Sequence, residues 1–313
     1  MTSPLPTRIA RRVRRLVGRS AQDAVTPTDL APGRRSRKRW LYEHQVPPER
    51  RISVLEGRHP GSRVLIVGAG PSAKRVLPYD GRLHEKWDVV IGLNGSVEHL
   101  RELDYFLSVE SKAYLWDWYH FRTDPRIVRC VSESGIRLAE EAGRPDDQPA
   151  YYLLRHVYEQ PVDIRRYVNG AGEEGLLVGP RGETGLGRGT VTLQAIHFAA
   201  LLGAGTIHVI GADMHFKPGS QHFYGGNEYG TEVVDGKRYH RLDVDHRLNP
   251  IVEVRHPETG ELVESTLHFK ESAEYIDEVI RTVLPPAGIE LVDFSHGLIS
   301  AAARADIDEF MLA

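Results

Sequence analysis

The chain has 313 residues, of which 41% are hydrophobic, so it is long enough to bury one large core. It contains no run near the roughly 20 consecutive apolar residues that cross a bilayer, and no apolar leader is evident. Residues 1–40 carry eleven Lys/Arg against two acidic residues, so the remaining chain has a net charge near −12, which argues against nucleic-acid binding. The single cysteine, Cys130, excludes an internal disulfide and favours a cytoplasmic location.

Residues 1–60 are predicted to form a basic, partly disordered extension. Within it, residues 8–19 place Ile9, Val13, Leu16 and Val17 on one helical face among arginines. Such a segment could rest on an anionic surface at the inner face of a membrane. The alternative is a solvated extension, because the apolar face is only about two turns long.

Residues 61–300 are predicted to form a Rossmann-like α/β domain, with a C-terminal tail at 301–313. Apolar runs predict strands at 63–67, 88–91, 104–109, 126–131, 151–154, 206–210 and 289–292. Helices are expected at 71–77, 96–102, 112–120, 190–202 and 272–284, with a long polar insertion at 213–270. Strands that alternate with helices predict a doubly wound, mainly parallel sheet.

The stretch from Val64 to Ser72 is typical of a buried strand followed by a phosphate-binding turn. Gly68 and Gly70 form the turn, and Pro71 is suited to the first position of a helix. Ser72 adds a hydroxyl and a backbone N–H where phosphate oxygens are well received.

Two further segments are expected at the same edge of the sheet. Asn94 follows the second strand, and Gly189 and Thr190 lead into a buried helix. Two glycine turns that feed helix N-termini favour an anionic, nucleotide-type ligand, although each turn alone could serve close packing. The chain lacks the third glycine of a dinucleotide-binding fingerprint, because Ala73 stands at that position. It also contains no Gly-x-x-x-x-Gly-Lys run, the sequence of a P-loop.

A fourth segment carries groups suited to proton transfer. Asp213 ends a strand and could bond ribose hydroxyls or hold a divalent metal ion. His215, His222 and Tyr224 follow within eleven residues, and each could donate or accept a proton. A surface position is the alternative for any one of the fifteen histidines.

Two other groups of residues are weaker candidates. His240, Asp243, Asp245 and His246 could coordinate a metal, but their spacing matches no standard zinc pattern, and a solvated loop explains them as well. Glu110 is either a polar contact or a turn residue.

Several of these motifs resemble the MptE-like domain superfamily over about residues 62–300. The resemblance rests on Gly68–Ser72, Leu93-Asn94, Leu107–Glu110 and the tract from Gly189 to Asp213. That group includes archaeal 6-hydroxymethylpterin diphosphokinases and bacterial motility accessory factors linked to flagellin glycosylation. The chain is also distantly similar to bacterial sialyltransferases with a Rossmann-like fold.

The resemblance implies roles for individual residues. The Gly68–Ser72 turn and Asn94 would meet the phosphate and sugar of a donor, with Gly189 and Thr190 at a phosphate-contacting helix start. Asp213 would address the ribose, or Mg²⁺ in kinase-like members. Tyr224 could face the phosphate, and His222, with His268 behind it, is the expected base.

These observations leave three hypotheses. The first is a glycosyltransferase, without a cofactor, that moves a nonulosonic-acid-type sugar from a CMP-type donor to a hydroxyl acceptor. The second is a diphosphotransferase that acts with ATP and Mg²⁺, for which Asp213 would be the metal ligand. The third is a non-catalytic nucleotide-binding module, which would have no need of the histidine loop.

Overall fold

The structure, a computed structural model, describes residues 46–109, 124–132, 150–153, 155–157, 164–165, 175–216, 231–240 and 249–313. Contacts group the chain from Val46 to Ala313 into one compact unit. Residues 1–45, which include the basic segment at 8–19, lie outside the described residues.

An eight-stranded parallel sheet forms the centre of this unit, with strand order β14-β13-β8-β1-β2-β3-β4-β5. Its strands are β1 (Arg63–Val67), β2 (Val89–Leu93), β3 (Tyr105–Ser108), β4 (Val128–Ser132), β5 (Tyr151–Leu153), β8 (Thr206–Ile210), β13 (Glu290–Asp293) and β14 (Ala303–Arg304). In register, Val64 of β1 pairs with Val89 of β2 and with Ile207 of β8. This arrangement confirms the predicted doubly wound α/β fold class.

The other strands form pairs. They are β6 (Arg155–Val157) with β7 (Leu176–Val178), β9 (Thr231–Val234) with β10 (Lys237–His240), and β11 (Ile251–Arg255) with β12 (Leu262–Thr266). The antiparallel pairs β9–β10 and β11–β12 both lie within the predicted polar insertion at 213–270.

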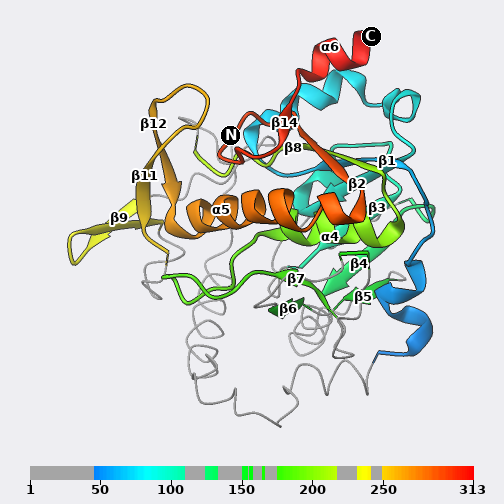
Figure 1. Cartoon of the computed structure of the whole chain (residues 1–313), viewed down its shortest axis with the longest axis horizontal. Helices are drawn as coiled ribbons and strands as arrows, with labels where there is room; N and C mark the ends of the chain where they lie inside the picture. The colour runs from blue at the N-terminus through cyan, green and yellow to red at the C-terminus, as the bar shows by residue number, and fades with distance from the viewer. Residues whose placement is uncertain are drawn as a thin grey trace, which may run out of the picture. The chain divides into compact units, whose positions relative to one another are not determined.

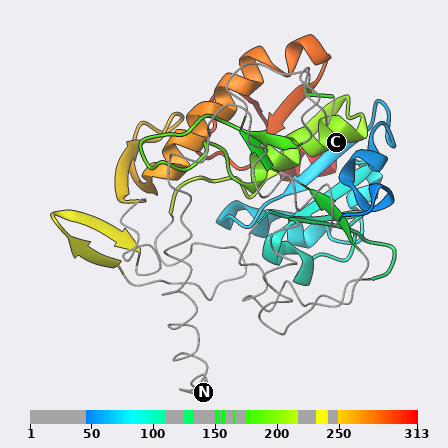
Figure 2. The same ribbon diagram turned by 90° about the horizontal axis from the view of Figure 1, so that it is seen from below.

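Helices cover both faces of the sheet. The α-helices are α4 (Val191–Leu202), α5 (Leu267–Thr282) and α6 (Ile307–Leu312). The 3-10 helices are η3 (Pro48–Arg50), η4 (Ile52–Leu55), η5 (Pro71–Tyr79), η6 (Leu83–Glu85), η7 (Asn94–Glu98) and η10 (Pro285–Ala287). Helices α4 and α5 lie side by side on one face, with their buried side chains in one core cluster (Figures 1 and 2). The opposite cluster contains side chains from η5, η6 and α6 around Trp87.

The compact unit extends beyond the predicted domain at both ends. Ile52 and Leu55 are fully buried against the α4 side of the core, so residues 46–60 belong to the fold and not to the extension. At the other end, β14 pairs with β13 and α6 buries Ile307 and Met311, so residues 301–313 are no tail.

Some helices differ from their predicted form. The helices expected at 71–77 and 96–102 are the 3-10 helices η5 and η7, and Pro78 inside η5 is incompatible with a regular α-helix. Helix α5 begins at Leu267, five residues earlier than expected, because Thr266 caps it by accepting the Phe269 N–H. The helix expected at 112–120 lies outside the described residues. Among the described helices, none combines the length and apolarity of a membrane span.

Candidate functional site

The strand order reverses direction between β1 and β8. From β1 the chain continues through β2 to β5 on one side, while β8, β13 and β14 lie on the other side. In open parallel sheets, ligands bind beyond the carboxyl ends of the strands at such a switch point. The loops that begin at Gly68 after β1 and at Gly211 after β8 meet here.

Glycine is required where these two loops touch. A Cβ on Gly68 would overlap the carbonyl oxygen of Gly211, and a Cβ on Gly211, whose φ is +80°, would overlap that of Gly68. The Gly70 N–H donates to the Gly211 carbonyl at 2.9 Å. The predicted turn residues Gly68 and Gly70 therefore join the two loops.

The Asp213 carboxylate occupies the start of η5. Asp213 is 1% exposed, and its Oδ2 accepts hydrogen bonds from the Ser72 N–H at 3.1 Å and the Ser72 hydroxyl at 2.7 Å. The Ser72 Oγ in turn accepts the Gly211 N–H at 3.0 Å. Pro71 is the first residue of η5, as predicted. The donors of Ser72 that we predicted for a phosphate are thus engaged by a carboxylate of the chain itself.

Backbone strain gathers at this edge of the sheet. Asn94, Met214 and His296 have φ values of +49°, +56° and +53°, and they follow β2, β8 and β13. Residues other than glycine rarely adopt this backbone conformation, and such strain is concentrated at functional sites.

Within the described part of the chain, the buried oxygen atoms without a hydrogen-bond partner include one directly after β2 and one at the end of β3. They are the Asn94 Oδ1, after β2, and the Ser108 Oγ, at the end of β3. A buried acceptor without a donor costs about 1–3 kcal/mol. A ligand that supplied a donor to Asn94 would recover part of that cost.

The second predicted phosphate-binding segment opens at the same edge. The Gly205 N–H donates to the Ser62 carbonyl, just before β1, so the C-terminus of α4 lies at the amino edge and its N-terminus at the carboxyl edge. Thr190 caps this N-terminus by accepting the Thr192 N–H at 3.2 Å. The α4 and η5 N-termini therefore share an edge of the sheet but belong to opposite faces.

Side chains of α5 hold the loop that precedes α4. The Gly189 N–H donates to the Ser272 Oγ at 3.0 Å, and Gly189 has a φ of +102°. The buried Glu271 carboxylate accepts the Glu183 N–H at 2.6 Å and the Thr184 hydroxyl at 3.2 Å. Glu271 and Ser272 were not predicted, since nothing in their sequence context distinguishes them from other residues of an amphipathic helix.

His215 lies against a second histidine, which was not predicted as a site residue. Its ring is 5.4 Å from the ring of His256, centroid to centroid, at an interplanar angle of 89°. The His256 Nε2 lies 2.9 Å from the carbonyl of His296, and its Nδ1 accepts the N–H groups of Glu258 and Thr259 at 3.3 Å. These partners assign the neutral Nε2–H tautomer to His256.

The remaining predicted residues fall into two groups. His222, Tyr224, Glu110, Asp243, Asp245 and His246 lie outside the described residues. His240 packs its ring on Phe216 at 4.8 Å, and the His268 N–H donates to the Asn249 Oδ1 at 3.0 Å near the start of α5. Within the described ranges, no group of three or more His, Cys, Asp or Glu side chains is arranged to hold a metal ion.

Asp293 is a further buried acid at this edge. It ends β13 and is fully buried, and its Oδ1 accepts the Ser295 N–H at 2.8 Å. Burial raises the pKa of this carboxyl, and the hydrogen bonds from Ser295 offset part of that rise.

Comparison with known proteins yields no match among protein-family models, curated proteins or solved structures. The fold and the geometry at the switch point define the class to which this chain belongs: α/β proteins with a doubly wound parallel sheet.

Proposed function

We propose that this chain is a transferase that binds a nucleotide-activated donor at the carboxyl edge of its sheet. The observation that carries the proposal is the switch point itself. There, two glycine loops fix Asp213, and the capped N-terminus of α4 opens at the same edge. The choice of a CMP-type donor, a nonulosonic-acid-type sugar and a hydroxyl acceptor follows from the sequence resemblance.

We assign the donor phosphate to the start of α4. A helix N-terminus favours an anion through its exposed N–H groups and its dipole. The start of η5 already holds the Asp213 carboxylate, so a phosphate there would face a like charge. Asp213 and Asn94 then serve the sugar hydroxyls of the donor, which can donate hydrogen bonds to their side-chain oxygens.

The proposed reaction needs one base and one group that stabilises the leaving phosphate. In our proposal His222 removes the proton of the acceptor hydroxyl as its oxygen bonds to the sugar carbon. The bond from that carbon to the phosphate oxygen breaks, and Tyr224 with Thr190 stabilises the charge on the departing nucleotide. In the same proposal, His215 accepts or donates a proton near the end of β8.

Thermal unfolding with CMP, CTP, ATP and UDP, each with and without Mg²⁺, tests the donor. A ligand at 100 times its Kd stabilises the folded state by about 2.7 kcal/mol. We expect stabilisation by the cytidine nucleotides in the absence of Mg²⁺. Stabilisation by ATP solely with Mg²⁺ would refute the glycosyl transfer and support the diphosphotransferase, and no response to any nucleotide would refute both.

Two matched variants test the site. Asp213→Asn should weaken nucleotide binding at least about tenfold, since it removes a charge and exchanges an acceptor for a donor. Asp88→Asn is the control, because the Asp88 Oδ2 accepts the Arg63 N–H at 2.8 Å at the opposite edge of the sheet. Equal affinities in both variants would contradict the placement of the donor.

The catalytic roles require a separate measurement. His222→Ala and Tyr224→Phe should lower turnover while the Kd for the nucleotide stays the same. Full turnover in both variants would contradict the roles given to these two side chains.

A further inference from the structure

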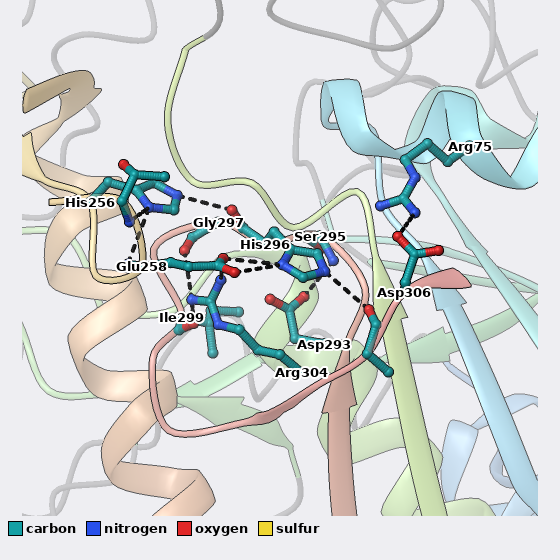
Figure 3. A network of polar contacts seen from close by, with 12 residues as sticks. Arg75, His256, Glu258, Asp293, Ser295, His296, Gly297, Ile299, Arg304 and Asp306 are labelled. Atoms are coloured by element: carbon teal, nitrogen blue, oxygen red, sulfur yellow. Dashed lines mark hydrogen bonds and ion pairs between the residues drawn. The ribbon is translucent and has the colours of Figure 1, made fainter. Parts of the chain in front are cut away.

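The side chains of Glu258, His296 and Arg304 form one network of polar contacts (Figure 3). Glu258 lies at the turn of the β11–β12 hairpin, His296 follows β13, and Arg304 ends β14. The Glu258 Oε2 is 3.1 Å from the His296 Nδ1 and 2.6 Å from an Arg304 nitrogen. The hydrogen bond from His296, together with the charge of Arg304, holds the pKa of Glu258 below its usual range.

The network holds the loop from Ser295 to Ile299 by its backbone. Arg304 donates to the carbonyl oxygens of Gly297 at 3.1 Å and Ile299 at 2.8 Å. Glu258 fixes the same guanidinium from the hairpin side, so the hairpin tip and the loop share one cation.

This loop packs directly on the Asp213 backbone. The Leu298 N–H donates to the Asp213 carbonyl at 3.1 Å, and a Cβ on Gly297 would overlap that same oxygen. The Ala212 N–H donates to the Ser295 Oγ at 2.9 Å. Displacement of the loop would therefore move the residue that occupies the start of η5.

His296 has an acceptor on each side of its ring. The Nδ1 faces the Glu258 carboxylate, and the Nε2 lies 3.0 Å from the Ala305 carbonyl. A neutral imidazole has one N–H and can satisfy one of these acceptors, whereas the imidazolium satisfies both. The other titratable or charged groups near this ring are Arg304, the buried Asp293, and His256, which donates to the His296 carbonyl.

We propose that Glu258, His296 and Arg304 are positioning residues that form a proton-dependent clamp on the Asp213 loop. With His296 doubly protonated, the hairpin tip, the Ser295–Ile299 loop and the Ala305 carbonyl are held together. Loss of one proton removes one hydrogen bond and loosens the loop against Asp213. Any effect of the clamp on the binding of a nucleotide-activated donor rests on the proposed function, whereas the clamp itself does not.

Hydrogen exchange of the full chain tests the clamp without a ligand. Glu258→Gln should lower the protection factors of amides in 211–215 and 295–299 by about fivefold, near the upper limit for an exposed charge pair. Asp124→Asn is the matched control, because it removes the carboxylate of an exposed pair with Arg126 at 2.7 Å, away from the network.

The pH profile separates a proton-dependent clamp from a merely structural contact. In the wild-type chain, the protection factors in 211–215 should fall as the pH is raised and His296 loses its second proton. His296→Gln keeps one donor and cannot titrate, so its protection factors should lack this fall.

Two results would overturn the clamp. One is that Glu258→Gln lowers the protection factors at the hairpin tip but leaves those of residues 211–215 unchanged. The other is a His296→Gln variant that keeps the wild-type pH profile. A chain that binds no nucleotide but shows the expected exchange pattern would refute the proposed function and leave the clamp standing.

Discussion

His208 should make the stability of the fold strongly dependent on pH below neutrality. His208 is 4% exposed and stacks on Phe294, 5.4 Å from centroid to centroid, and its buried Nδ1 has no hydrogen-bond partner among the described residues. Burial lowers the pKa of His208 from 6.5 to about 4. The unfolded chain therefore binds this proton at a higher pH than the folded chain does, so stability falls as the pH drops from 6.5 to 4. At 1.36 kcal/mol per pKa unit, the loss approaches about 3 kcal/mol at pH 4.

Urea unfolding of the wild type and of His208→Leu at a series of pH values measures this loss. The leucine variant cannot take up the proton. Its free energy of unfolding, relative to that of the wild type, should therefore be about 3 kcal/mol higher at pH 4 than at pH 7. The exposed His99→Gln variant controls for removal of an imidazole from the surface. Equal slopes for the wild type and His208→Leu between pH 6.5 and pH 4 would refute this account.

Three further predictions concern other buried contacts. Gly70→Ala should lower the free energy of unfolding by about 1–3 kcal/mol and weaken nucleotide binding, because its Cβ would overlap an Asp213 carboxylate oxygen; unchanged calorimetric stability would contradict this. Asp277→Asn should cost about 1–3 kcal/mol in urea unfolding, since its carboxylate accepts two backbone N–H groups beyond β13, while the exposed Glu278→Gln on the same helix should cost less than about 0.5 kcal/mol. Burial raises the pKa of the Cys130 thiol, so a thiol reagent should label it in the unfolded chain at least about 100-fold faster than in the folded chain, and comparable rates would refute its burial.

The centre of the fold was predictable because burial there is uniform along the sequence. β1 and β8 are short apolar runs bounded by glycine or polar residues, and both occupy the predicted ranges. Every residue of α4 after Val191 is buried, and its ends are marked by Thr190 and Gly203 in the sequence. Local signals of this kind need no knowledge of distant residues.

The C-terminal segment shows why the periphery was harder to predict. Asp306 caps α6 by accepting the N–H groups of Asp308 and Glu309, which is a local signal for a short helix. Whether such a helix docks depends on a distant partner, here Trp87, whose ring stacks on Phe310 at 5.3 Å. A six-residue helix has little stability alone, so its burial could not be derived from its own sequence.

The glycine turn after β1 illustrates the same limit within the candidate site. The sequence of Gly68–Ser72 predicts backbone and hydroxyl donors, but it does not predict which anion accepts their hydrogen bonds. The acceptor is the Asp213 carboxylate, 141 residues further along the chain, and its burial is tolerable because those donors solvate the charge. A phosphate at the same position would have to displace this carboxylate and leave it buried without its partners. The start of η5 therefore favours a group that donates hydrogen bonds, and the capped start of α4 is the better place for the negative charge of a donor.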